Sequence, residues 1–354
     1  MITVEKTKWP KTKPVDESAL GFGAVFSDHM FVMKYEEGLG WHDAKIVPYG
    51  PISIMPTAMC LHYGQEVFEG MKAYRGEDDS IYLFRPEENI KRLERSCQRM
   101  CIPPLPGEVV MEGLKQLVEL DSEWVPHIKD ASLYIRPFVI ATEAKLGVKA
   151  SNSYDFYIVL SPSGPYYATG LDPVRIYVEE HLSRAAKGGT GEAKTAGNYA
   201  ASLLAGEQAH AAGYSQVLWL DSAEKKYVEE VGAMNIFFVI DDTVVTPALS
   251  GSILPGITRK SAIEILRHWG VKVQERQISI DEVLQAGVDG RLKEVFGTGT
   301  AAVISPVGEL KVGDNVLYIG DGKTGPLSKK LYDYLTDLQW GRGEDPFDWR
   351  VKVK

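Results

Sequence analysis

One lysine of the sequence stands in an unusual local setting. The segment from 187 to 199 reads Lys-Gly-Gly-Thr-Gly-Glu-Ala-Lys-Thr-Ala-Gly-Asn-Tyr, so Lys194 is surrounded by glycines and other small residues just before a predicted helix. Most lysines are solvated surface residues, but small neighbours let a ligand approach the backbone closely. An amine attacks an aldehyde once desolvation or a neighbouring cation lowers its pKa. The segment therefore indicates either a Schiff-base lysine or a phosphate-binding loop.

The phosphate-loop alternative requires the pattern Gly-x-x-x-x-Gly-Lys-Ser/Thr. Residues 188–195 nearly fit it, and residues 216–221 resemble a strand that ends in a magnesium-binding aspartate. However, Ala193 occupies the place of the second glycine, and its Cβ disfavours the positive φ that this position commonly needs. Gly197 would also interrupt the helix that should follow at once. A P-loop-like nucleotide-binding protein is therefore the weaker hypothesis.

A Schiff-base lysine is most useful with pyridoxal phosphate, which also needs an acid at its ring nitrogen and donors for its phosphate. Glu230 is the candidate acid because it ends a predicted strand beside a glycine, whereas Glu229 is expected to be solvated. Phosphate binds well at helix N-termini. Residues 254–259 begin a predicted helix, and residues 297–300 offer further backbone amides.

The composition excludes several classes of protein. The chain has 354 residues, 44% of them hydrophobic and 25% charged, which is typical of a folded globular protein. A net charge of −9 without basic clusters argues against a nucleic-acid partner. No stretch is apolar enough for a signal peptide or a membrane helix. Three cysteines and no ligand spacing favour a reducing cytoplasm, with neither a disulfide framework nor a metal site.

Strand-like and helix-like segments alternate along the chain. Strands are predicted at 80–84, 133–140, 155–160, 216–220 and 235–240, and helices from Pro86, at 199–212, at 257–269 and from Ser279, which fits a capping box. A Pro/Gly/Ser-rich stretch near residue 165 separates two halves. We therefore predict a smaller N-terminal α/β domain at 1–168, a linker at 169–174, and a larger C-terminal α/β domain at 175–354. Ligand pockets favour such junctions.

Seven segments together resemble one enzyme family. They are Tyr63–Tyr74, Leu83–Arg92, Tyr134–Pro137, Lys194–Tyr199, Glu230–Phe237, Leu254–Arg259 and Phe296–Ala301. In this order they resemble the branched-chain aminotransferases, which belong to the class IV pyridoxal-phosphate enzymes together with D-amino-acid aminotransferase and aminodeoxychorismate lyase. The resemblance runs from about residue 20 to about residue 310, and it implies the D-amino-acid-aminotransferase-like fold of type IV. That fold has two mixed α/β (α+β) domains, with the cofactor at their interface.

The resemblance also implies roles for individual residues. Lys194 would carry pyridoxal 5'-phosphate and shuttle the proton, Glu230 would pair with the ring nitrogen, and Tyr199 with the phenolate oxygen. The phosphate would be held by Arg92, Ile257, Thr258 and Thr300. The substrate pocket would be lined by Tyr63, Phe68, Tyr134, Arg136, Tyr166, Ala233 and Ala301.

The implied reaction is reversible amino transfer between leucine, isoleucine or valine and 2-oxoglutarate. Aromatic walls would suit the aliphatic side chains, and Arg136 could receive the γ-carboxylate of glutamate. An apolar wall distinguishes one methylene by only about 1–3 kcal/mol, so all three amino acids are expected substrates. A D-amino-acid aminotransferase is the alternative within the class, but its chains are shorter.

Three further features follow from the same resemblance. Leu146 and Val148 resemble residues that a partner subunit lends to the pocket, so a homodimer is implied. Ala233 stands where mammalian members have threonine. Ala302 and Ser305 replace a mammalian Cys-x-x-Cys pair, and neither side chain can form a sulfenic acid or a disulfide.

Overall fold

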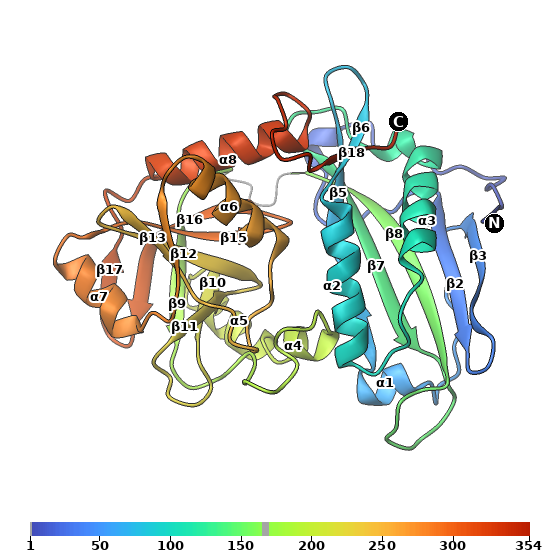
Figure 1. The fold of residues 1–354 in the computed structure, drawn as a ribbon, viewed down its shortest axis with the longest axis horizontal. Helices are drawn as coiled ribbons and strands as arrows, with labels where there is room; N and C mark the ends of the chain where they lie inside the picture. Colours follow the sequence, from blue (N-terminus) through green and yellow to red (C-terminus); the bar gives the residue numbers. More distant parts are fainter. Residues whose placement is uncertain (1, 165–169) are drawn as a thin grey trace. The chain divides into compact units, whose positions relative to one another are not determined.

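The computed structural model of the protein describes residues 2–164 and 170–354. The chain divides into two compact units, each with its own sheet (Figure 1). The first unit consists of Met1–Tyr166, Ala193–Ala196 and Asp337–Lys354, and the second of Tyr167–Glu192 and Gly197–Thr336. None of the helices in the described ranges is long and apolar enough to cross a membrane.

The first unit is built on a nearly antiparallel sheet. Among the described residues its order is β1-β3-β2-β8-β7-β5-β6-β18, with β4 paired to β7, and only β1 and β3 run parallel. The strands are β1 Thr3–Val4, β2 His29–Glu36, β3 Gly40–Pro48, β4 Glu66–Phe68, β5 Met71–Arg75, β6 Ile81–Phe84, β7 Ser132–Ala141, β8 Ser153–Ser163 and β18 Arg350–Lys352. The helices are α1 Met59–Tyr63, α2 Pro86–Arg99 and α3 Gly107–Leu120, with 3-10 turns at Glu17–Ala19 and Ser122–Trp124.

The second unit contains a mixed sheet. Its described order is β11-β10-β9-β16-β15-β12-β13-β14, with β17 paired to β16, and a β11–β12 pairing closes six of these strands into a ring. The strands are β9 Val174–Glu179, β10 Gln216–Leu220, β11 Val228–Val231, β12 Met234–Ile240, β13 Thr243–Thr246, β14 Lys272–Glu275, β15 Leu292–Gly299, β16 Val303–Val312 and β17 Asn315–Tyr318. The remaining helices along the chain are α4 Ala196–Ala200, α5 Leu203–Ala211, α6 Ile257–His268, α7 Ile280–Val288 and α8 Pro326–Gln339.

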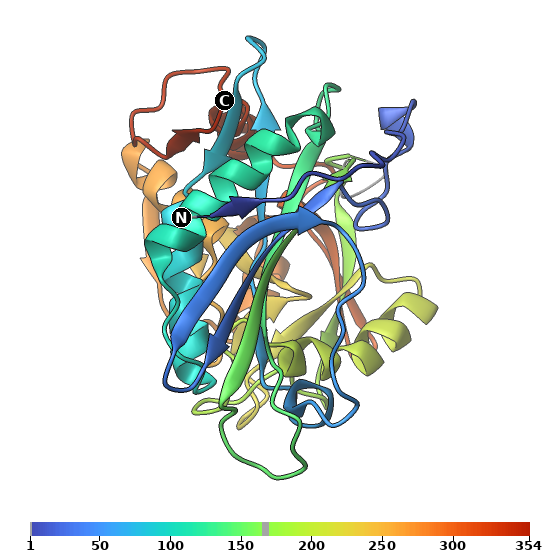
Figure 2. The ribbon, with the colours of Figure 1, turned by 90° about the vertical axis from the view of Figure 1, so that its right-hand side faces the viewer.

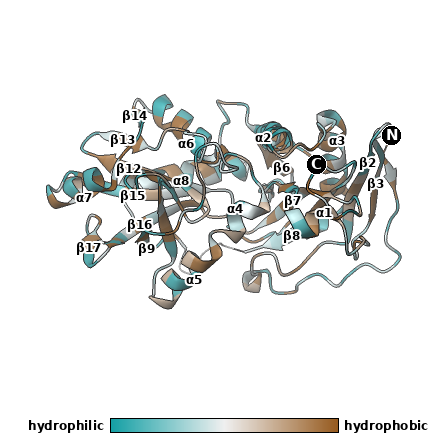
Figure 3. Cartoon of the chain, turned by 90° about the horizontal axis from the view of Figure 1, so that it is seen from below, coloured by the Kyte–Doolittle hydropathy of each residue, from teal (hydrophilic) through white to brown (hydrophobic). Residues whose placement is uncertain are grey.

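Each sheet has its own apolar core. In the first unit α2 and α3 lie side by side across one face of the sheet (Figure 2), and α2 buries Ile90, Leu93 and Cys97 at helical spacing. In the second unit α7 turns Ile280 and Val283 into the core, so hydrophobic and hydrophilic residues alternate along it (Figure 3). Each fully buried side chain of this size contributes about 1.5–3 kcal/mol.

Most predicted elements are present. The helix from Pro86 and the helix from Ile257 are confirmed, and Ser279 is the N-cap of α7, where its Oγ accepts the Glu282 N–H at 3.1 Å; among the described residues the Glu282 carboxylate pairs with Arg276 and not with the Ser279 N–H that a full capping box requires. The helix predicted at 199–212 is instead two helices, α4 and α5, separated at residues 201–202. Cys97 lies in α2, whereas Cys101 lies beyond the end of this helix at Arg99 and is exposed, with a φ of 55°.

The domain boundaries differ from the prediction in two places. Residues 337–354 belong to the first unit because β18 pairs with β6, which adds a strand to the first sheet. Residues 193–196 also belong to the first unit, although they lie far beyond residue 168 in sequence. The start of the Pro/Gly/Ser-rich stretch, up to Ser163, is strand β8, and Thr169 of the predicted linker lies outside the described residues.

Candidate active site

Lys194 is held by the backbone of the first unit. Its N–H donates to Oγ of Ser96 in α2 at 2.9 Å, and its carbonyl accepts the N–H of Phe68 in β4 at 2.9 Å. The hydroxyl of Thr195 donates to the carbonyl of Glu66 at 2.6 Å. Because the loop is bound on both sides, the Lys194 side chain starts from a fixed backbone, and its Nζ lies 4.8 Å from the centre of the Phe68 ring.

Two more predicted pocket residues lie beside this ring. Cζ of Arg136 is 4.7 Å from the centre of the Phe68 ring and 5.3 Å from that of Tyr134, and Nη2 of Arg136 donates to the Tyr134 hydroxyl at 3.1 Å. Aromatic faces attract cations. Gly70 leaves room for this arrangement, since a Cβ there would lie 2.1 Å from the Tyr134 hydroxyl. The first unit thus brings four predicted site residues together.

Arg92 is buried against a carboxylate that the sequence did not single out. Its Nε lies 2.7 Å from Oε1 of Glu69 and its Nη2 2.9 Å from Oε2, which also accepts Nδ2 of Asn89 at 2.8 Å. Burial alone would raise the pKa of Glu69, but Arg92, together with Lys194 and Asn89, holds it below its usual range. Removing one partner of such a buried pair costs about 3–5 kcal/mol. Glu69 therefore fixes the orientation of Arg92.

Other predicted residues of the first unit lie at its surface. The exposed fraction is 39% for Tyr63, at the end of α1, 65% for Leu146 and 86% for Val148. The last two lie in the segment that joins β7 and β8. Tyr166 lies outside the described residues.

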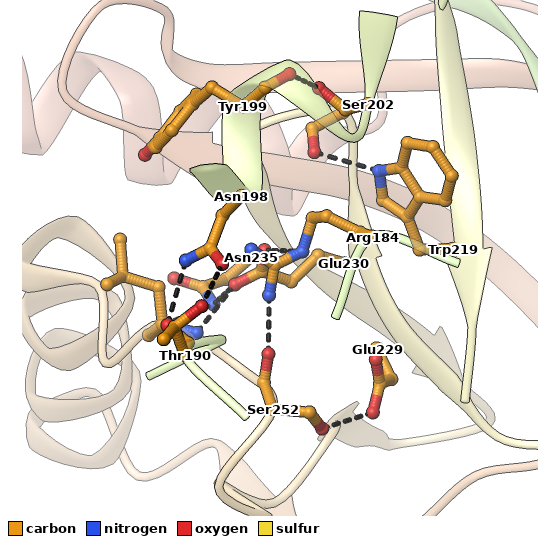
Figure 4. A network of polar contacts seen from close by, with 12 residues as sticks. Arg184, Thr190, Asn198, Tyr199, Ser202, Trp219, Glu229, Glu230, Asn235 and Ser252 are labelled. Carbon is orange, nitrogen blue, oxygen red and sulfur yellow. Dashed lines mark hydrogen bonds and ion pairs between the residues drawn. The ribbon is translucent and has the colours of Figure 1, made fainter. Parts of the chain in front are cut away.

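In the second unit Glu230 is the centre of a polar network (Figure 4). Its Oε1 accepts the N–H of Leu254 at 2.9 Å and Nδ2 of Asn235 at 3.3 Å. Its Oε2 lies 2.9 Å from Nε of Arg184, and both side chains are buried. A buried carboxylate with several donors can stay ionised without bulk water.

Glu229 is not the solvated acid that the sequence predicted. It is buried on the same strand as Glu230, and its carboxylate accepts the hydroxyl of Ser252. Burial raises the pKa of Glu229, which the Ser252 bond only partly offsets. Successive residues of a strand point to opposite faces, so the two acids have different surroundings.

The other predicted site residues of the second unit lie at the start of a helix or in turns between strands. Ile257 and Thr258 are the first residues of α6, whose N-cap, Gly256, makes no side-chain cap bond. Thr300 and Ala301 form the turn between β15 and β16. Ala233 is an exposed residue of the turn between β11 and β12.

Tyr199 lies in α4, which is tied to the glycine-rich loop. Asn198 accepts the Thr190 hydroxyl at 2.7 Å and donates Nδ2 to the Thr190 carbonyl at 2.8 Å. The carbonyl of Tyr199 accepts the hydroxyl of Ser202 at 2.7 Å (Figure 4). The loop and the start of the helix therefore hold each other in place.

The donors present fit pyridoxal phosphate better than a metal-nucleotide complex. Within the described ranges, Nε of Arg136 and Oγ1 of Thr298 are buried without a hydrogen-bond partner, as groups that await a ligand would be. Over the same ranges no three His, Cys, Asp or Glu side chains gather as metal ligands. Asp221, the aspartate of the phosphate-loop alternative, accepts four backbone N–H groups of its own turn.

Sequence reasoning missed four residues of these networks: Glu69, Ser96, Arg184 and Asn235. Glu69 and Asn235 lie inside segments that carry the family resemblance, so their position was a usable signal. No sequence signal pointed to Ser96 or Arg184. Each meets its partner only because the folded chain brings distant segments together.

The chain belongs to the class IV aminotransferases. The family model described as "Amino-transferase class IV" matches residues 66–310, which contain the Lys194 loop and Glu230. Enzymes of this family depend on pyridoxal 5'-phosphate.

The similar proteins belong to the branched-chain group of this family. The "Branched-chain-amino-acid transaminase 1" of Bacillus subtilis is 62% identical over 100% of this chain and 99% of its own. The branched-chain-amino-acid aminotransferase of Mycolicibacterium smegmatis is 48% identical over 99% and 98%. The crystal structure of the Escherichia coli branched-chain enzyme has a TM-score of 0.77 at 29% identity, covering 92% of this chain and 99% of its own. The T.th. enzyme, complexed with N-(5'-phosphopyridoxyl)-L-glutamate, has a TM-score of 0.75 at 28% identity, covering 92% and 98%.

Proposed function

We propose that this aminotransferase reversibly transfers the amino group of leucine, isoleucine and valine to 2-oxoglutarate, with pyridoxal 5'-phosphate attached to Lys194. The observation that carries the proposal is the cluster of Lys194, Phe68, Tyr134 and Arg136, which combines an amine, a guanidinium and two aromatic faces. The names of the Bacillus subtilis and Escherichia coli relatives support the substrate class.

Each residue contributes a separate part of the chemistry. When bound, pyridoxal phosphate supplies a carbonyl carbon that takes up the amino group and a ring that accepts the electron pair left at the substrate Cα. Nζ of Lys194 removes and returns the proton at Cα. Glu230 keeps a negative charge at the ring nitrogen, and Tyr199 offers its hydroxyl to the phenolate oxygen. The phosphate is held by Arg92, Thr300 and the backbone amides of Ile257 and Thr258.

One pocket must accept two kinds of substrate. Phe68 and Tyr134 exclude water from an aliphatic side chain, while Arg136 binds the γ-carboxylate of glutamate or 2-oxoglutarate. The buried Nε of Arg136, which has no hydrogen-bond partner in the described ranges, supports this role. Tyr63, Tyr166, Ala233 and Ala301 complete the proposed pocket.

The active form proposed here is a cytoplasmic homodimer. Leu146 and Val148 are strongly exposed apolar side chains, and a second copy of the chain would cover them. The three cysteines are all free thiols, which suits a reducing compartment. Analytical ultracentrifugation tests the dimer: replacing both residues with aspartate should shift the enzyme toward the monomer and lower its activity.

The visible spectrum tests the central proposal. The purified protein should be yellow, and borohydride reduction should abolish the visible band and leave the cofactor attached to Lys194, as peptide mass spectrometry would show. Lys194→Ala should bind cofactor but lose transamination. A colourless protein that binds ATP with magnesium would overturn the proposal.

A further inference from the structure

Arg184 faces Glu230 as a buried cation. The exposed fraction is 7% for the Arg184 side chain and 4% for that of Glu230, and Nε lies 2.9 Å from Oε2. Nε of Arg184 is buried and outside hydrogen-bond geometry among the described residues, so the contact with Oε2 is an ion pair. Nη2 donates instead to the carbonyl of Ser252, which fixes the guanidinium from its other end (Figure 4).

Asn235 holds the other carboxylate oxygen. It lies opposite Glu230 in the β11–β12 ladder, and its Nδ2 lies within hydrogen-bond distance of Oε1 of Glu230 (3.3 Å) and the carbonyl of Leu254 (3.0 Å). The N–H of Leu254 donates to the same Oε1 at 2.9 Å. Asn235 therefore ties the carboxylate to the segment that leads directly into α6.

A carboxylate buried in a sheet is more stable with a proton than with a charge unless a cation and donors compensate for lost water. The proposed role of Glu230 needs the charged form in a fixed place. We infer that Arg184 and Asn235 are positioning residues of the transamination site: Arg184 keeps Glu230 ionised, and Asn235 fixes Oε1 relative to the start of α6. This inference rests on the proposed function, since both residues act through Glu230.

A double-mutant cycle on the holoenzyme tests the inference. The variants are Arg184→Gln, Glu230→Gln and the double variant, with Asn235→Ala beside them. Arg175→Gln is the matched control, because the exposed side chain of Arg175 forms an ion pair with Glu309 in the same unit, away from Glu230. The readouts are kcat with leucine, the cofactor dissociation constant, and the nitrogen-15 chemical shift of cofactor labelled at the pyridine nitrogen.

The expected pattern separates positioning from structural support. Arg184→Gln should lower kcat about 10-fold or more and move the nitrogen-15 shift toward the neutral pyridine value, as when the support of a ligand-binding side chain is removed. In the Glu230→Gln background the same change should add less than about 2-fold, because its target is gone. Arg184→Lys should recover most of the shift, and Asn235→Ala should loosen cofactor binding while Arg175→Gln changes nothing.

Two outcomes would overturn the inference. One is a wild-type nitrogen-15 shift in Arg184→Gln together with a wild-type cofactor dissociation constant in Asn235→Ala, and the other is a double variant whose losses simply multiply. If Arg184→Gln does not fold, Arg184→Met, which also removes the charge, decides by the same shift, and Asn235→Ala decides by the cofactor dissociation constant. A wild-type protein without a cofactor band would instead refute the proposed function, so the two failures are distinguishable.

Discussion

Two neighbouring glutamates show how the environment assigns a role to a residue type. Glu230 faces Arg184, Asn235 and the Leu254 N–H, whereas Glu229 faces the hydroxyl of Ser252. Glu230 is thus surrounded by donors and a cation, which favour the charged form. At Glu229, burial raises the pKa, and the Ser252 hydroxyl and the charges of Arg184 and Lys225 offset this effect only in part. A fixed negative charge is therefore better supported at Glu230.

Replacing Glu230 and Glu229 separately by glutamine tests this difference. Glu230→Gln should bind cofactor yet lose about 10²-fold or more in kcat, because a fixed charge that stabilises the reacting state is removed. Glu229→Gln is the control and should change kcat little, since glutamine resembles the protonated acid and keeps the Ser252 bond. Single-turnover absorbance changes give both rates. Similar losses at the two positions would mean that the wrong acid has been assigned.

Arg136 should matter more for one half-reaction than for the other. Arg136→Ala should slow the half-reaction with glutamate or 2-oxoglutarate by about 10- to 100-fold more than that with leucine, because hydrogen bonds to charged groups contribute roughly 1.5–3 kcal/mol. Stopped-flow spectroscopy with each substrate separately measures both. An equal loss in the two halves would show that Arg136 supports the pocket without binding a carboxylate.

At the scale of elements, β12 and the start of α6 approach each other closely at Gly256. A Cβ at Gly256, the N-cap of α6, would lie 2.0 Å from Oδ1 of Asn235. The backbone of Gly256 has φ −65° and ψ 136°, which any residue can adopt. An alanine at this position would therefore clash with the side chain of Asn235 without straining its own backbone.

Gly256→Ala should displace Asn235 and weaken cofactor binding. Overpacking of this kind costs typically about 1–3 kcal/mol, so the melting temperature of the apoenzyme should also fall. Gly206→Ala in α5 is the matched control: a Cβ there meets nothing within 4 Å, and the change should leave stability equal or slightly higher. Fluorescence titration with pyridoxal phosphate measures the affinity. Unchanged affinity and melting temperature in Gly256→Ala would show that β12 and α6 tolerate the extra atom.

At the scale of the whole chain, the surroundings of the three cysteines determine how easily each thiol is oxidised. Cys97 is fully buried, and burial raises its pKa to about 12. Burial also raises the pKa of Cys60, while Cys101 is exposed. Oxidation by peroxide requires the thiolate, so the two shifted thiols are poor targets. Cys97 is accordingly part of the apolar core of the first unit.

Mild peroxide should leave turnover unchanged. Activity is measured against peroxide dose, with and without thiol reductant afterwards, beside a control protein with an exposed thiol of low pKa. A reversible loss that disappears in a Cys97→Ser, Cys101→Ser double variant would reveal a redox switch and contradict the expectation.

Local patterns determined much of this protein. The small-residue loop around Lys194, the strand that ends at Glu230 and the helix start at Ile257 are all read from neighbouring residues, because turns, caps and periodicity are local properties. The order of the seven segments was enough to indicate the family, which the family match and the relatives confirm.

The tertiary structure decided what local patterns cannot encode. Arg184 and Glu230 are far apart in sequence, as are Glu69 and Arg92, and only chain packing turns each into a buried ion pair. The same holds for the burial of Glu229 and for β18, which pairs with β6 although residues 81–84 and 350–352 are far apart in sequence. Burial and long-range pairing depend on the free energy of the whole fold, so the surroundings of a charged side chain emerge only when that fold is complete.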